Sequence, residues 1–165
     1  MVKRPGAGPI VAALALGAWL GAALFFSLVV APAAFRSLGS IAVAGILVRN
    51  TLPAIFDAGM VAGLLLLWLG AGGERSRPRL IRLACGIGVA GCCAVAEFGV
   101  VWHLDQLRAR LATPIETLAP SDPSRIAFDH LHSLSVGLLG VAMILAVVGI
   151  ILLVRSGLAS AVSPE

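Results

Sequence analysis

Charged residues are scarce in this chain: 12% of its 165 residues are Asp, Glu, Lys or Arg, whereas 59% are hydrophobic. Soluble domains carry about 25% charged residues. A soluble fold of this size has too little polar surface to cover so many apolar side chains. The composition therefore argues against an ordinary soluble protein and predicts a single membrane domain that spans residues 1–165.

Disulfide bonds are not expected, because the three cysteines lie in one apolar run. Cys85 and Cys92 share a helix face, but roughly 10 Å of helix separates them, which is too far for a disulfide. Cys92 and Cys93 are neighbours that point apart. We expect all three to be small packing residues.

Motifs of known chemistry are missing as well. The sequence contains no HExxH, CxxC, phosphate-binding loop or nucleophile elbow. The net charge of +4 would suggest nucleic acid in a soluble protein, but here the charges follow membrane topology. Nothing in the sequence therefore supports nucleic-acid binding or the activity of a soluble enzyme. Whether the protein is an enzyme at all stays open, and the sequence favours a protein that is not one.

Four long apolar runs dominate what is present. They cover residues 9–35, 54–71, 83–102 and 133–154. Each is near the ~20 helical residues that cross a hydrocarbon core. The first run is longer than the ~7–15 residues of a signal-peptide core, so we expect it to remain as a transmembrane helix. These runs predict an all-α integral membrane protein, an up-down-up-down four-helix bundle surrounded by lipid.

Two shorter segments border these runs. Residues 40–51 are apolar but too short to span, and they indicate either a short interfacial helix on the outer surface or the first turns of a long second helix kinked at Pro53. The third run continues into the charged stretch HLDQLRARL, which predicts a polar helical extension that ends by Pro114.

Positive charge concentrates on one side of the predicted bundle. That side carries Lys3, Arg4, Arg75, Arg77, Arg79, Arg82 and Arg155, against Glu74 and Glu165. On the other side, arginines are balanced by acids in the 36–53 and 103–131 segments. The positive-inside rule therefore places both termini in the cytoplasm, and we expect a bacterial inner membrane.

Two pairs of small residues predict tight helix contacts. Gly17 and Gly21 lie four residues apart in the first run, and Gly59 and Gly63 do so in the second. Glycine at this spacing lets helix backbones approach closely in lipid. The same faces suggest a homo-oligomer or a structural role as the partner of another membrane protein.

The candidate functional residues gather at the predicted outer ends of the helices. A metal site could draw on His132, His103, Glu97 and Asp57, and the surrounding polar cluster comprises Arg36, Asn50, Asp129 and Ser135. Glu97 is the sharpest signal, because a charge inside a membrane helix costs about 2.5–3.5 kcal/mol. It must find a partner or be protonated, and a packing role, paired with Arg36 or His132, is as plausible as a functional one.

His132 is the histidine with the clearest expected geometry. Asp129 lies one helical turn before it and could accept a hydrogen bond from one ring nitrogen. The other nitrogen would face a polar group of another helix, for which Asp57, Glu97 and Asn50 are candidates. This arrangement would suit a metal ion or an axial haem ligand.

The order and spacing of several residues resemble a known family. They are Trp19, Gly21, Phe25, Pro32 and Phe35 in the first run, Gly45, Pro53, Phe56 and Gly59 in the second, and Phe128, Leu131, His132 and Ser135 in the fourth. The chain resembles small four-helix membrane proteins of unknown function related to an animal transmembrane protein linked with platinum-drug resistance. The resemblance implies fold and membrane location, and its pattern includes His132 and Ser135 but not Glu97 or His103.

Three functions remain open at this stage. The first is a non-enzymatic integral membrane protein for transport or stress tolerance with a polar outer cavity. The second is a metal- or haem-binding redox protein. The third is a structural subunit of a membrane complex.

We predict that a cysteine engineered at Thr117 reacts with a membrane-impermeant maleimide from outside the cell, whereas one at Ser76 does not. The charge bias between the two sides is the physical reason. Labelling of intact cells measures the difference, with permeabilised cells as the control. The reverse pattern would invert the orientation.

Overall fold

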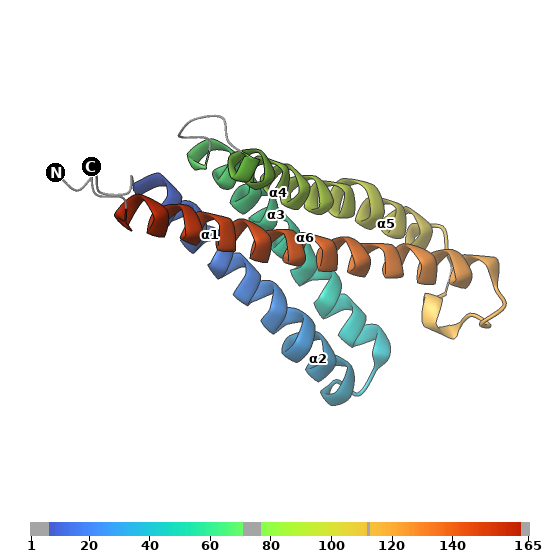
Figure 1. The fold of residues 1–165 in the computed structure, drawn as a ribbon. Coiled ribbons are helices and arrows are strands. Elements are labelled where there is room, and N and C mark those ends of the chain that lie inside the picture. The colour runs from blue at the N-terminus through green and yellow to red at the C-terminus, as the bar shows by residue number, and fades with distance from the viewer. Residues whose placement is uncertain (1–6, 71–76, 112, 163–165) are drawn as a thin grey trace.

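The computed structural model describes residues 7–70, 77–111 and 113–162, and within these ranges it contains only helices and their connections (Figure 1). Four helical segments are long and apolar enough to cross a membrane: Ala7–Ser37, Ile41–Leu69, Arg77–Ala109 and Pro123–Ser156. They pack as a bundle whose successive members run in opposite directions. The expected four-helix membrane bundle is confirmed.

The first hairpin contains α1 (Ala7–Phe25), the π-helical segment η1 (Phe26–Val30), α2 (Ala31–Ser37) and α3 (Ile41–Leu69). Because α3 runs unbroken through Pro53, the short interfacial helix expected at 40–51 is wrong, and the reading of these residues as the first turns of a long second helix is confirmed. Proline removes one backbone donor, a loss that membrane helices tolerate.

The second hairpin contains α4 (Arg77–Ala94), the π-helical segment η2 (Val95–Val101) and α5 (Trp102–Ala109), followed by the 3-10 turn η3 (Ile115–Thr117) and α6 (Pro123–Val162). Helix α5 confirms the polar extension. The Asp122 carboxylate accepts a hydrogen bond from the Ser124 N–H at 2.7 Å and so caps α6. Of the expected inner loop, residues 71–76 lie outside the described residues.

Trp19 joins the two helices of the first hairpin. Its side chain is 4% exposed, and its indole N–H donates a hydrogen bond to the Ile55 carbonyl at 2.8 Å. The indole fits there because Gly59 has no side chain: a Cβ on Gly59 would lie 2.8 Å from the indole nitrogen and 2.5 Å from the sulfur of Cys93. Trp19 is therefore a packing residue, and Gly59 makes room for it.

Gly63 brings α3 against α4. A Cβ at this position would lie 2.7 Å from the Ala90 backbone nitrogen and 2.8 Å from the Gly86 carbonyl oxygen. These contacts are with backbone atoms, which cannot move aside as a flexible side chain can. The Gly59 and Gly63 pair therefore allows the close helix contact that the sequence predicted, and this contact lies within a single chain.

Gly17 and Gly21 do not pack against the rest of the described chain, so the expected tight contact does not form within the chain at these two positions. Nothing lies within 4 Å of a Cβ built on either residue. The inward face of α1 is formed by Ala12, Leu16, Trp19 and Ala23, each of which is buried. Positions 17 and 21 lie to one side of that face and are exposed.

Arg82 closes the end of the bundle near the two termini. Although charged, it is only 9% exposed. Its guanidinium donates hydrogen bonds to the Gly70 carbonyl at 3.2 Å and to the Ser156 hydroxyl at 3.0 Å. It thereby joins the last turn of α3 to α4 and α6 and satisfies a carbonyl at a helix end.

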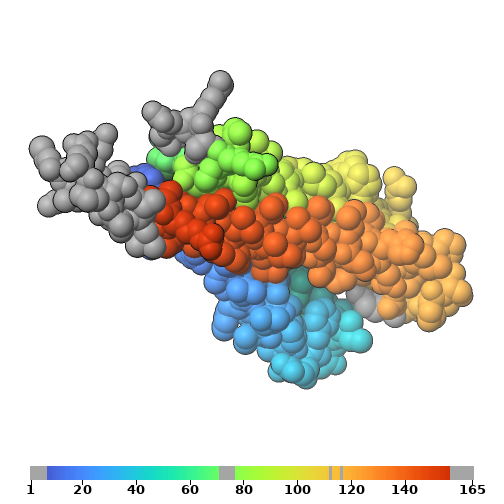
Figure 2. All heavy atoms as spheres, viewed as in Figure 1, coloured from blue at the N-terminus to red at the C-terminus, as the bar shows by residue number. Residues whose placement is uncertain are grey.

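The opposite end of the bundle is open. We call it the distal end; it comprises α2, the first turns of α3, α5 and the first turns of α6. There the α2–α3 end diverges from α5 and α6 (Figure 1). In the space-filling view the two parts separate into a projecting lobe and a long bar (Figure 2).

We predict that Gly63→Ala lowers the midpoint of thermal unfolding in detergent, because the new methyl group must displace the backbone of α4. Overpacking of this kind costs about 1–3 kcal/mol. Gly21→Ala, at a position with open space, serves as the matched control and should leave the midpoint unchanged. Equal midpoints for the two variants would mean that α3 and α4 are not in close contact.

We also predict that Arg82→Met destabilises the protein by about 2–3 kcal/mol, because charged hydrogen bonds of about that strength are lost. Arg77→Met, which removes an exposed arginine at the start of the same helix, is the control. Thermal unfolding followed by circular dichroism measures both. Equal effects would show that Arg82 contributes only its charge.

Candidate functional site

A cavity of about 180 Å³ lies at the distal end, between the two diverging hairpins. Its walls are mainly apolar. On one side they include Phe35, Ile41, Val48 and Leu52, and on the other Val101, Leu104, Ile115 and Phe128. A second cavity of about 340 Å³ adjoins it and shares Gly45, Arg49, Arg108 and Ile115 with it. The distal end can therefore admit a small apolar group.

Three arginines from three helices also line the first cavity. They are Arg49 of α3, Arg108 of α5 and Arg125 of α6. Arg125 donates a hydrogen bond to the Ile115 carbonyl at 3.4 Å, and the Arg108 guanidinium lies 4.9 Å from the centre of the Phe128 ring. The cavity thus combines an apolar wall with several cationic groups, which are the groups that recognise phosphate and carboxylate.

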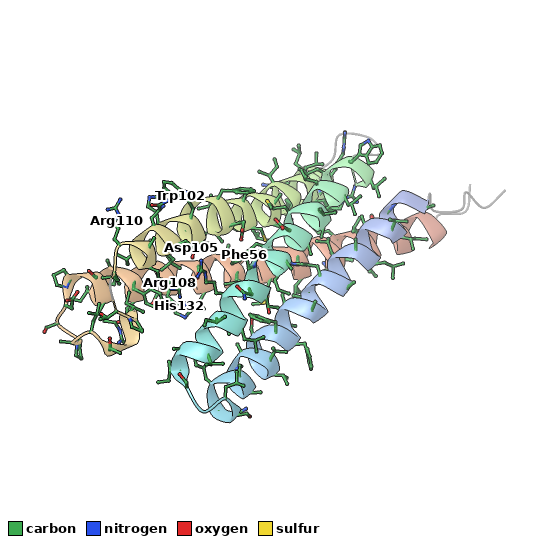
Figure 3. All side chains as sticks on the ribbon, turned by 180° about the vertical axis from the view of Figure 1, so that it is seen from behind. Phe56, Trp102, Asp105, Arg108, Arg110 and His132 are labelled. Atoms are coloured by element: carbon green, nitrogen blue, oxygen red, sulfur yellow. The ribbon has the colours of Figure 1, made fainter. Side chains whose placement is uncertain are left out.

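Two aspartates partly balance these arginines. Asp105 Oδ1 lies 2.9 Å from Arg49 Nε and 3.7 Å from Arg108 Nη1, and Asp129 Oδ2 lies 3.5 Å from Arg125 Nε. Figure 3 shows Asp105 and Arg108 on the side of α5 that faces α3, whereas Arg110 points to the opposite side. The Arg49–Asp105 contact is an ion pair that connects the two hairpins.

This ion pair is weakly held. The side chains of Arg49 and Asp105 are 46% and 39% exposed, and exposed pairs contribute about 0–1 kcal/mol. Asp105 Oδ1 is itself buried, yet within the described residues it accepts no hydrogen bond of good geometry. The pair is therefore a close contact of charges without directed hydrogen bonding.

His132 lies at the wall of the cavity rather than inside the bundle. Its ring is exposed and stacks on Phe128, with 6.1 Å between ring centres and planes 1° apart. The expected hydrogen bonds from His132 to Asp129 and to another helix are absent from the described part of the chain. Asp129 pairs with Arg125 of the same helix, and the neighbouring hairpin diverges at this level.

Ser135 is the one buried polar residue in the cavity wall. It is 2% exposed, and its hydroxyl donates a hydrogen bond to the His132 carbonyl at 2.9 Å. The hydroxyl is thus satisfied by its own helix. Arg36 and Asn50, which we expected in the polar cluster, are exposed and do not line the cavity.

The four predicted metal ligands do not come together. Among the described residues, no group of three or more His, Cys, Asp or Glu side chains could hold a metal ion. His103 Nδ1 lies 2.6 Å from the Gly99 carbonyl of its own helix, and Asp57 is exposed on α3. The described residues therefore do not assemble the four predicted ligands into one metal centre.

Glu97 lies in the π-helical segment η2 and is partly buried. Its Oε2 atom is buried and has no hydrogen-bond partner among the residues described. Neither Arg36 nor His132 forms the ion pair that we considered for it. An ionised carboxylate without a partner is costly inside a membrane-spanning helix.

Sequence reasoning missed the arginines of the cavity. We used Arg49, Arg108 and Arg125 only as charges that predict the orientation of the chain in the membrane. A signal was available, since each lies within a few residues of the distal end of an apolar helix. The sequence does not show how each helix is rotated about its axis, and this rotation brings the three arginines to the same cavity.

One protein family matches the chain over residues 14–112, and its description is domain of unknown function (DUF4149). No curated protein and no solved structure matches. The matched residues cover most of the helical segments α1 to α5 and end before α6, so the His132 and Ser135 pattern falls outside them. Because the match covers more than half of the chain, the protein belongs to the DUF4149 family, which fits its four helices of membrane-spanning length.

Proposed function

We propose that this protein is a non-enzymatic component of a bacterial inner membrane that receives an amphipathic molecule in its distal cavity, as part of transport or stress tolerance. The observation that carries the proposal is the cavity itself. It lies between two hairpins and has apolar walls next to three arginines. Ligand sites in helical membrane proteins are commonly built between helices in this way.

The orientation of the protein is part of the proposal. The charge bias of the sequence supports cytoplasmic termini and a distal end on the outer side. The cavity would then open at the outer face, where molecules arrive from outside or from the outer leaflet. Its ring of arginines would lie at the level of the lipid headgroups.

The stress-tolerance part of the proposal rests on the resemblance to relatives of an animal transmembrane protein linked with drug resistance. A cavity that accepts partly apolar molecules is consistent with such a role. A metal- or haem-based function has no support in the arrangement of the histidines and acids within the described residues.

We predict that filling the cavity abolishes stabilisation by short-chain lipid. Dihexanoyl phosphatidylcholine or phosphatidylglycerol at tenfold excess over its dissociation constant should stabilise the purified protein by about 1.4 kcal/mol, a rise of a few degrees in the unfolding midpoint. Val48→Trp places an indole in the cavity and should remove this rise. Val43→Trp, on the same helix at a position that is 51% exposed and outside the cavity wall, should keep it.

Differential scanning fluorimetry in a fixed detergent gives both midpoints. The same lipid-dependent rise in Val48→Trp and Val43→Trp would mean that lipid acts on the outside of the bundle. The proposed cavity function would then be wrong.

A further inference from the structure

We infer that the molecule received by the cavity is an anionic phospholipid of the surrounding bilayer, with its phosphate between Arg49, Arg108 and Arg125. This inference rests on the proposed function and names the ligand class for the same site. Guanidinium groups are always charged and present forked donors that match phosphate oxygens. Three of them from different helices line one space of headgroup size.

The shape of the cavity favours a lipid over a free phosphate ester. Leu52 lies three residues along α3 from Arg49, Val101 lies seven residues along the third membrane segment from Arg108, and Ser135 lies ten residues along α6 from Arg125. At 1.5 Å per residue, these steps reach roughly 5–15 Å toward the membrane interior. Toward the membrane interior, the wall that extends from the charged groups is thus mainly apolar, and Gly45 and Ile41 continue it outward along α3.

The size of the cavity agrees with this orientation. A volume of about 180 Å³ holds a phosphate headgroup and the first carbons of a lipid, but not two acyl chains. The hairpins diverge at this end of the bundle (Figures 1 and 2), so the remaining chain atoms can leave between them into the bilayer. The exposed apolar side chains of α1 and α3 would lie against those chains.

Asp105 competes with the lipid for the arginines. Its carboxylate is 2.9 Å from Arg49 and 3.7 Å from Arg108, and both arginines line the cavity. The Arg49 pair is half-exposed and lacks a directed hydrogen bond. A phosphate that offers two or three oxygens can replace such a contact. The structure assigns to Asp105 the role of holding Arg49 in place until an anionic headgroup takes over.

The two members of this ion pair give opposite predictions. Arg49→Gln removes a phosphate donor and should weaken binding of dihexanoyl phosphatidylglycerol roughly tenfold, as expected for the loss of a charged hydrogen bond. Asp105→Asn removes the competing carboxylate and should strengthen binding of the same lipid several-fold. If the ion pair only joins the hairpins, both variants lower stability and binding alike.

Native mass spectrometry of the full chain in a fixed detergent measures binding of dihexanoyl phosphatidylglycerol, dihexanoyl phosphatidylcholine and glycerol 3-phosphate. The wild type should bind the phosphatidylglycerol roughly tenfold more tightly than the phosphatidylcholine and should not retain glycerol 3-phosphate. Arg110→Gln is the matched control, because Arg110 lies on the same polar segment but points away from α3 (Figure 3). It should leave all three values unchanged.

Three results would overturn the inference. The first is equal binding of the two lipids that Arg49→Gln does not change but Val48→Trp blocks. The cavity would then bind lipid, as proposed, but would not select an anionic headgroup. Retention of glycerol 3-phosphate as strong as that of the lipid would make a soluble phosphate ester the ligand. Binding of neither lipid would contradict the proposed function as well.

Discussion

Helix α3 lies against α1 and α4 at two of its glycines, Gly59 and Gly63, and the shape of the molecule depends on this close approach. At Gly59 the indole of Trp19 enters the space and donates its N–H to the Ile55 carbonyl. One turn further, Gly63 lies within van der Waals contact of the α4 backbone. In lipid, where apolar side chains gain little by leaving the solvent, such dense packing is the main force that holds helices together.

The distal cavity follows from where this close packing ends. Arg82 closes the bundle near the termini, and the glycines hold its middle. Toward the distal end, the facing positions carry large side chains such as Val48, Leu52 and Phe128. The two hairpins diverge there and leave a space between these side chains that the chain does not fill.

The charges at the distal end have a double role in this arrangement. As a group they are nearly balanced by acids, which agrees with the predicted placement of these segments on the outer side. Individually, Arg49, Arg108 and Arg125 face one space, and their acidic partners hold them through long or exposed contacts. The proposed recognition of an anionic ligand would use these arginines, which already face one cavity.

The sequence by itself determined the four membrane helices, their alternation and the gathering of polar residues at one end, because each depends on the local length and polarity of a segment. It also identified Gly59 and Gly63, though it gave Gly17 and Gly21 equal weight. Only the tertiary structure decided which glycine pair contacts other helices of the chain, that His103 turns to its own backbone, and that three arginines line the cavity beside His132 while His103, Glu97 and Asp57 do not. These features depend on how each helix rotates about its axis and where the hairpins diverge, and both are set by packing between segments distant in sequence.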